Sequence, residues 1–257
     1  MQRFIVEGYV TLKSNLPSDF HARMFDALET LDEGGPHGHN NLLPCVPELR
    51  VLLDEPVVAG ALTSILGPDY YLHFHRHDHV NFPDSAQPLH KDGDNHTHYA
   101  IDGLRRHHVT RYAMLLYYPQ DTPIEIGPTG VVPGSQYLEN RDELFGAPRV
   151  WEEEPDLGAR DSPRHLPAGS DTEGLPACGT AGTVTFIHFD LWHRAFPNQT
   201  DKVRYMMKFQ FHRMSEPKGP SWNREDPAGV STGDGLPKQD VVWEQHWDWL
   251  NGCDSET

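Results

Sequence analysis

In the first quarter of the chain the apolar residues follow two different spacings, which predict two kinds of secondary structure. Residues 4–12 (FIVEGYVTL) form a short apolar run that predicts a strand. Between Pro17 and Gly34 the apolar side chains recur at helical spacing, which predicts a helix. A second helical stretch is expected over residues 47–66, interrupted near Pro56 because a proline inside a helix removes a backbone hydrogen bond.

From residue 70 onward the period of the pattern changes to two. Residues 71–82 (YLHFHRHDHVNF) alternate in character as a strand does. Helices followed by many short strands indicate an α+β fold that is mainly β. We therefore expect a double-stranded β-helix core of the jelly-roll or cupin-like type over about residues 70–212, with the N-terminal helices packed on it. Further strands are expected over residues 110–118, 130–132, 183–188 and 204–212.

Two long segments lie within or beyond that core without a clear strand pattern. Residues 140–180 are polar, and we expect them to form a surface excursion or an active-site lid, not a second domain. The tail over residues 220–257 carries three tryptophans after position 240, which are expected to dock it onto the body or to form an oligomer contact. Residues 1–257 are then a single domain, expected to be a monomer or a homodimer.

Composition narrows the class of partner. The chain has 257 residues and a formal net charge of −17. A surface this acidic repels phosphate backbones and anionic membranes, so we expect a small-molecule substrate and neither nucleic acid nor membrane. No run of about 18 apolar residues is present in the sequence. The three cysteines lack metal-site spacing, and their odd number excludes a full disulfide framework, which favours reduced thiols and a cytoplasmic location.

A pair of potential metal ligands stands in the segment QPLHKDGD, where His90 and Asp92 are two residues apart. On a strand such positions point to the same side, so both side chains can reach one ion. His193, in the segment FIHFDLWHRAF, is the best third ligand, and His188 is its rival. Two histidines and one carboxylate form the facial triad of Fe(II) oxygenases. By itself, a His-x-Asp pair is more often a polar surface feature in a chain with 17 histidines and 38 acidic residues.

The context of this pair changes that interpretation. The segments QPLHKD, EIGPTGVVPGSQ and WHRAFPNQTDKVR occur in this order. Together they resemble the phytanoyl-CoA dioxygenase family, which includes ectoine hydroxylase, over about residues 70–212. The resemblance implies that His90, Asp92 and His193 hold the metal. Two positions depart from the family's pattern: Gln136 stands in place of a histidine, and Ala195 where some members use a serine to contact the co-substrate.

The same resemblance implies Fe(II) as the metal, 2-oxoglutarate as co-substrate and O2 as oxidant. Arg204, eleven residues after His193, would bind the distal carboxylate of 2-oxoglutarate, for which a guanidinium fork is well suited. Asn81 matches an asparagine that contacts the co-substrate in some relatives. Strand alternation places Arg204, Met206, Lys208 and Gln210 on one face, and Tyr205, Met207, Phe209 and Phe211 on the other.

The residues that contact the substrate are less clearly defined. On a strand, Asn81 shares its face with alternating histidines, of which His77 and His79 are expected to line the pocket unless this face is solvated. Arg105 and Arg106 belong to a basic run in an acidic protein. That run could receive a carboxylate or phosphate of the substrate, or it could balance nearby acidic side chains.

The resemblance therefore implies a non-haem Fe(II)- and 2-oxoglutarate-dependent dioxygenase that hydroxylates a small molecule and releases succinate and CO2. No catalytic residue is expected beyond the metal centre, since the protein's part is to orient the substrate and exclude water. The same centre could instead catalyse desaturation, cyclisation or epimerisation. A metal- or ligand-binding β-helix protein without turnover is the less favoured alternative.

Overall fold

A computed structural model describes residues 2–33, 41–92, 110, 112–137 and 174–213 of the chain. The described helices come first, and most of the strands follow them, as the sequence indicates. The helices are α1 (Gln2–Glu7), α2 (Ser18–Glu33), α3 (Leu49–Leu53) and α4 (Pro56–Leu66), with short 3-10 turns at Ile124–Ile126 and Ser135–Tyr137. The strands are β1 (Tyr9–Lys13), β2 (Tyr70–Asn81), β3 (Tyr112–Tyr118), β4 (Thr129–Val131), β5 (Leu175–Pro176), β6 (Thr183–His188), β7 (His193–Ala195) and β8 (Arg204–Arg213).

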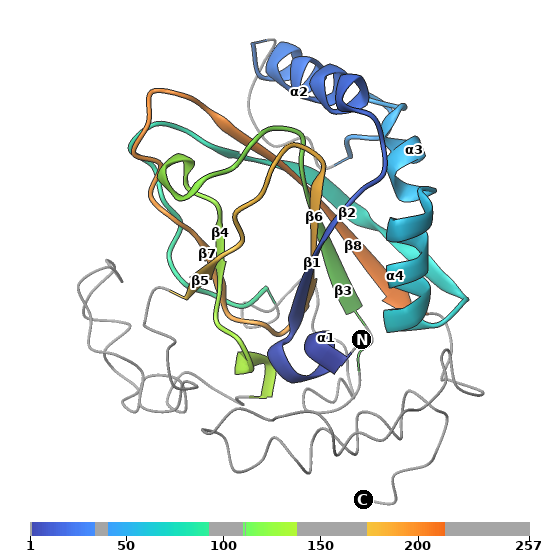
Figure 1. Cartoon of the computed structure of the whole chain (residues 1–257). Helices are drawn as coiled ribbons and strands as arrows, with labels where there is room; N and C mark the ends of the chain where they lie inside the picture. Colours follow the sequence, from blue (N-terminus) through green and yellow to red (C-terminus); the bar gives the residue numbers. More distant parts are fainter. Residues whose placement is uncertain (1, 34–40, 93–109, 111, 138–173, 214–257) are drawn as a thin grey trace, which may run out of the picture.

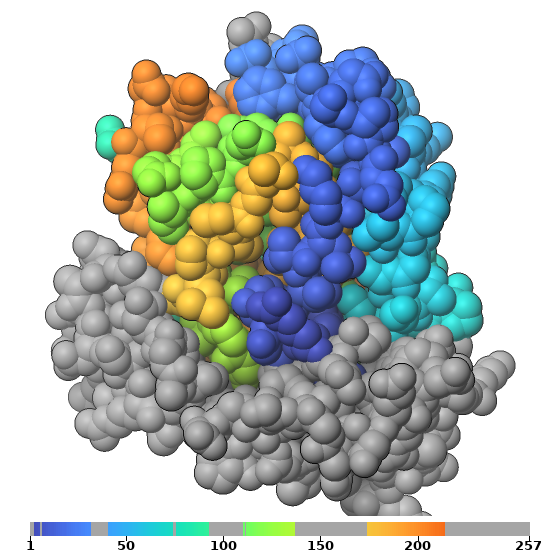
Figure 2. Space-filling view, in the orientation of Figure 1, coloured from blue at the N-terminus to red at the C-terminus, as the bar shows by residue number. Residues whose placement is uncertain are grey.

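The strands form two antiparallel sheets that face each other (Figure 1). The larger sheet has the order β1-β6-β3-β8-β2, and the smaller one the order β5-β4-β7. Helices α2, α3 and α4 lie on the outer side of the larger sheet, where they form a continuous blue-to-cyan layer in Figure 2. This arrangement confirms the coarse expectation of antiparallel sheets with N-terminal helices packed on them. The complete double-stranded β-helix remains a prediction.

Strand β3 divides the interior into two apolar clusters because its side chains alternate between the two faces of the sheet. Ala113, Leu115 and Tyr117 belong to the cluster beneath the helices, and Met114 and Leu116 to the cluster between the sheets. Every residue of β3 is buried. A strand covered on both faces is apolar throughout, which is why this one lacks the alternating pattern of a half-exposed strand.

Strand β8 has the same two faces, but its inner face is polar. Tyr205, Met207, Phe209 and Phe211 pack in the cluster beneath the helices, while Met206 belongs to the cluster between the sheets. The alternation predicted for this strand is confirmed. Its inner face therefore carries buried polar and charged groups between the sheets, and these groups must find partners there. The buried polar residues of that face are Arg204, Lys208 and Gln210.

The first prediction along the chain is wrong in its first half. Residues 4–12 are not one strand, since α1 ends at Glu7 and β1 begins at Tyr9. Gly8 separates the two elements with a φ of +79°, which glycine adopts without strain. Phe4 and Ile5 are both buried, so these apolar residues belong to the core although they lie in a helix. Strands β5 and β7 were not anticipated. They have 2 and 3 residues, and so short an element shows no periodicity.

Several expectations concern residues that the structure does not describe. The proposed lid over residues 140–180 falls mostly outside the described residues, and so does the tail over residues 220–257. Cys45 and Cys178 are free and exposed, and Cys253 lies outside the described residues. Among the described residues, no helix is both long and apolar enough to cross a membrane.

Candidate metal centre

His90 and His193 are joined by a pair of backbone hydrogen bonds. The amide of each residue donates to the carbonyl of the other, at 2.9 Å in both directions. His193 begins β7, whereas His90 forms an isolated antiparallel bridge outside the named strands. Directly paired residues point to the same face of a ladder, and the two imidazole centroids lie 4.3 Å apart. The pairing thus brings together two rings that are distant in sequence.

Asp92 completes the group on the same side as His90. Lys91, between them, turns the other way, is buried, and lies with its ammonium 5.7 Å from the centroid of the Trp192 ring. The Oδ1 atom of Asp92 is 3.7 Å from Nε2 of His90 and 3.8 Å from Nε2 of His193. One ligand atom from each of the three residues lies within 4.8 Å of the others, so the group could hold one metal ion. The predicted alternation holds although this segment is not a regular strand.

Both imidazoles have the tautomer and charge that a metal ligand needs. Nδ1 of His90 lies 2.8 Å from the carbonyl of Pro88, and Nδ1 of His193 lies 2.9 Å from that of Leu191. A carbonyl can only accept, so Nδ1 carries the proton and Nε2 keeps a lone pair directed at the centre. Burial lowers the pKa of His193 to about 3 and lowers that of His90 as well. At neutral pH both rings are therefore uncharged, and each can donate its Nε2 lone pair to a metal ion.

Asp92 is ionised and is held by a lysine from β8. Nζ of Lys208 donates to Oδ2 of Asp92, and the side chains of these two residues are only 5% and 13% exposed. Burial alone would raise the pKa of Asp92, but the Lys208 ammonium and the two imidazoles hold it well below its usual range. The third candidate ligand is therefore a carboxylate at any ordinary pH.

Arg204 is a buried cation with no acidic partner among the described residues. Its Nε donates to the carbonyl of Gly127 at 3.1 Å, and one terminal nitrogen donates to the carbonyl of His79 at 3.0 Å. Burial lowers its pKa, because the charged form loses hydration that two carbonyls replace only in part. Such a guanidinium is suited to receive an anion that the described residues do not supply.

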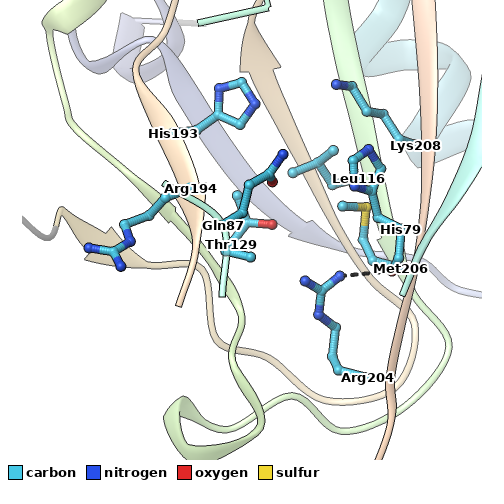
Figure 3. Close-up of a pocket in the computed structure, with 10 residues that line it drawn as sticks. His79, Gln87, Leu116, Thr129, His193, Arg194, Arg204, Met206 and Lys208 are labelled. Carbon is cyan, nitrogen blue, oxygen red and sulfur yellow. Dashed lines mark hydrogen bonds between the residues drawn. The ribbon is translucent and has the colours of Figure 1, made fainter. Parts of the chain in front are cut away.

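The candidate ligand His193 and the two buried cations border a single pocket between the sheets (Figure 3). His193 projects into it from β7, while Lys208 and Arg204 project from β8. A metal ion at the triad and an anion at Arg204 would thus share one cavity. The full lining is His79, Gln87, Leu116, Thr129, His193, Arg194, Ala195, Arg204, Met206 and Lys208.

Comparison with known proteins agrees with this arrangement. A family model described as phytanoyl-CoA dioxygenase (PhyH) matches residues 9–206. The chain belongs to the phytanoyl-CoA dioxygenase family. That match runs from β1 to the start of β8 and includes all three candidate ligands. No curated protein matches the sequence.

Solved structures resemble the fold of this PhyH-family chain at low sequence identity. The epimerase SnoN from nogalamycin biosynthesis, in complex with Fe3+, alpha ketoglutarate and nogalamycin RO, has a TM-score of 0.59 and 18% identity, over 91% of this chain and 93% of that one. HygX from Streptomyces hygroscopicus, with nickel and 2-oxoglutarate bound, has a TM-score of 0.57 and 17% identity, over 92% and 96%. EvdMO1 has a TM-score of 0.59 and 18% identity over 83% of this chain, which spans only 49% of that protein.

Asn81, expected at the co-substrate, lies beside the pocket and braces the loops around it. Its Nδ2 donates to the carbonyls of Gly127, at 3.1 Å, and Phe196, at 3.0 Å, while its Oδ1 accepts from Ser85. Asn198 in turn donates to the Asn81 carbonyl at 2.9 Å. Both amide hydrogens of Asn81 are thus used within the protein, and its contact with a co-substrate stays a prediction.

The histidine row on β2 faces inward in part. His79 lines the pocket, and its Nε2 lies 2.7 Å from Nε2 of His77. One of these two nitrogens must donate and the other accept, so the pair is not doubly charged. Burial, followed by repulsion from the Lys208 ammonium, lowers the pKa of His79 well below its usual value. The other predicted substrate residues, Arg105 and Arg106, lie outside the described part of the chain.

Lys208 and Thr129 are among the polar residues of the pocket that were not predicted as functional. Lys208 was placed on the correct face of β8, but nothing in the sequence pattern links it to Asp92. Thr129 pairs directly with Ala195, so it presents a hydroxyl beside the position where the family pattern can have a serine. Cross-strand register between β4 and β7 would have been needed to find it.

His188, the rival ligand, is not part of the metal group. It ends β6, is fully enclosed, and its Nδ1 accepts from the amide of Asp190 at 3.1 Å. Burial is the main cause that lowers its pKa to about 4. Its role in the described structure is that of a neutral core histidine.

Gly127 should be required for the support of Arg204 and Asn81. Its φ is +73°, its carbonyl accepts from both side chains, and a Cβ there would overlap Nδ2 of Asn81 and approach the Phe196 carbonyl to 2.5 Å. We expect Gly127→Ala to lower the free energy of unfolding by about 1–3 kcal/mol in urea titrations. Gly60→Ala is the control, since nothing lies within 4 Å of a Cβ at that helical position. Equal stability of Gly127→Ala and wild type would contradict the proposed packing.

His188 should make the metal-free protein less stable in mild acid. Its pKa is about 4 in the folded state, against an ordinary value of 6.5, so the unfolded chain binds more protons between these values. Stability therefore falls as pH drops from about 6.5 to 4, by up to roughly 3 kcal/mol from this group. His188→Asn keeps an acceptor for the Asp190 amide but does not titrate. We expect the loss between pH 7 and pH 4.5 in urea titrations to be smaller in this variant. An identical loss in both proteins would remove His188 as the cause.

Proposed function

We propose that the protein is a non-haem Fe(II)- and 2-oxoglutarate-dependent dioxygenase that hydroxylates a small molecule and releases succinate and CO2. The observation that carries this proposal is one pocket lined by both His193 and Arg204. His193 belongs to a His-Asp-His group that can hold one metal, and Arg204 is a buried arginine without an acidic partner among the described residues. When bound, Fe(II) and 2-oxoglutarate together activate O2 to oxidise an unreactive carbon–hydrogen bond.

The donor set fits Fe(II). His90, Asp92 and His193 supply two neutral imidazole nitrogens and one carboxylate oxygen, which is the ligand set of the facial triad. An octahedral ion keeps three further positions with such a set. The predicted co-substrate would need two of them for its keto and carboxylate oxygens, which leaves one for O2.

The pocket also fits a dicarboxylate co-substrate. Arg204 retains hydrogen-bond donors beyond those given to Gly127 and His79, since a guanidinium carries five. The hydroxyl of Thr129 accepts from Tyr118 at 2.8 Å, so its own proton remains for a carboxylate in the pocket. These two groups would hold the distal carboxylate, with Thr129 replacing the hydroxyl that Ala195 lacks. Asn81 would contribute mainly by fixing the Gly127 carbonyl.

The prime substrate would approach the metal beside His77 and His79, with Arg105 and Arg106 as further contacts. We keep the single domain, the cytoplasmic location and the monomeric or homodimeric state as proposals. Desaturation, cyclisation or epimerisation remains the second candidate outcome, because SnoN, with a similar fold, is described as an epimerase. Product mass distinguishes these outcomes: hydroxylation adds one oxygen, desaturation or ring closure removes two hydrogens, and epimerisation leaves the mass unchanged.

Removal of one proposed ligand should abolish metal binding. We expect wild type to bind one Fe(II) or Ni(II) per chain, measured anaerobically by calorimetry, and His193→Ala to bind neither ion tightly. His212→Ala is the matched control, since that histidine lies at the far end of β8 and contacts Tyr71 through Nδ1 at 2.8 Å. Retention of metal binding and of succinate formation in His193→Ala would overturn the assignment.

Loss of the buried guanidinium should weaken the co-substrate and spare the metal. We expect Arg204→Met to raise the KM for 2-oxoglutarate about 30-fold or more, as one truncated partner of a buried charge-assisted pair costs about 2–5 kcal/mol. Metal affinity should stay within about threefold, because Arg204 does not touch the triad. Arg76→Met is the control, since Arg76 pairs with Phe209 on the other face of the same sheet. An unchanged KM would exclude Arg204 from the site.

A further inference from the structure

Lys208 is a buried ammonium in a place where a metal-binding site does not need one. It stands at the middle of the inner face of β8, opposite His77 on β2 and Leu116 on β3. Its side chain is only 5% exposed, and its Nζ reaches Oδ2 of Asp92. A cation beside a metal ligand repels the incoming metal ion, so Lys208 does not serve to strengthen metal binding. The role of Lys208 must therefore lie in its effect on the Asp92 carboxylate.

The two oxygens of Asp92 have different partners. Oδ1 is the atom near Nε2 of His90, at 3.7 Å, and near Nε2 of His193, at 3.8 Å. Oδ2 accepts the charge-assisted hydrogen bond from Lys208. One oxygen is thus presented to the ligand group, while the other is held by the opposite sheet.

We propose that Lys208 restricts Asp92 to ligation through a single oxygen and so keeps one metal coordination position open. This inference rests on the proposed function. With a single Asp92 oxygen, the triad and a chelating co-substrate fill about five of six octahedral positions. A carboxylate that turned both oxygens to the metal would take the sixth and exclude either O2 or one arm of the co-substrate. Lys208 is therefore a positioning residue that acts through Asp92.

Lys208→Met tests this directly, because methionine has a similar length and no charge. The proteins are loaded with Ni(II) and their crystal structures compared. We expect the metal to contact Oδ1 alone in wild type and both Asp92 oxygens in Lys208→Met. Calorimetry should show metal affinity that is unchanged or higher in the variant, with 2-oxoglutarate bound about 10- to 100-fold more weakly to the metal complex, as expected for a competing charged ligand group.

Two further variants keep the test decisive. Lys208→Arg retains a cation at Oδ2 and should restore single-oxygen ligation and most of the 2-oxoglutarate affinity. Lys202→Met removes the same charge from an exposed position before β8 and should behave as wild type. Thermal melting of each variant shows whether it is folded.

Three results would overturn the inference. Asp92 bound through one oxygen in Lys208→Met, with unchanged 2-oxoglutarate affinity, would show that the lysine does not control ligation. Complete loss of metal binding in a folded Lys208→Met would show that Lys208 places Asp92 without setting its denticity. If Lys202→Met had the same effects as Lys208→Met, the effects would come from the loss of one positive charge and not from the contact between Lys208 and Asp92. If wild type itself bound neither Ni(II) nor 2-oxoglutarate, the proposed function would fail instead.

Discussion

The reciprocal backbone hydrogen bonds between His90 and His193 are the contact on which the candidate site depends. They join the segment after β2 to β7, and β7 pairs with β4 in the smaller sheet. Because directly paired residues present their side chains on one face, this contact alone sets the spacing of two of the three candidate ligands. Asp92 follows two residues after His90 and keeps the same side. The site is therefore a product of backbone pairing between strand β7 and a segment that lies outside the named strands.

The second determinant is the charge enclosed between the sheets. Strand β8 brings Arg204 and Lys208 into an interior where His79, His90 and His193 are neutral. Among the described residues, Asp92 is the carboxylate close to these two cations. Buried cations are unfavourable unless they are paired, and of the two described cations on β8 Asp92 pairs with Lys208 and not with Arg204. Arg204 is left with two carbonyls, an incomplete replacement for water. A fold that keeps such a residue accepts lower stability in the absence of its ligand, as functional sites commonly do.

Much of the scaffold was readable from the sequence, and part of the site was not. Periodicity located α2, β2 and β8 because each is long enough to show a repeat. It misassigned α1, where six residues are too few to distinguish a buried helix from a strand. The metal group was predicted through motif resemblance, since the spacing of His90 and Asp92 alone is common. Lys208 and Thr129 were missed because their roles depend on which strands are neighbours, and strand order is not local information.

The inward row of β2 shows how far register decides this site. Between the pairs Leu72↔Phe211 and Arg76↔Phe209, β2 advances four residues while β8 advances two. A slip of one residue would turn every later side chain of β2 to the opposite face. This irregularity inserts an even number of residues into β2, so the faces of the strand are preserved. Leu72 and Arg76 both stay on the helix side. His77, His79 and Asn81 stay on the pocket side. The alternation in the sequence was therefore a valid guide to the faces of β2 on both sides of the bulge, although the bulge itself left no trace in the pattern. Because the pairs His77↔Lys208 and Asn81↔Arg204 lie beyond the irregularity, the bulge also fixes which inward groups of β2 stand opposite the two buried cations.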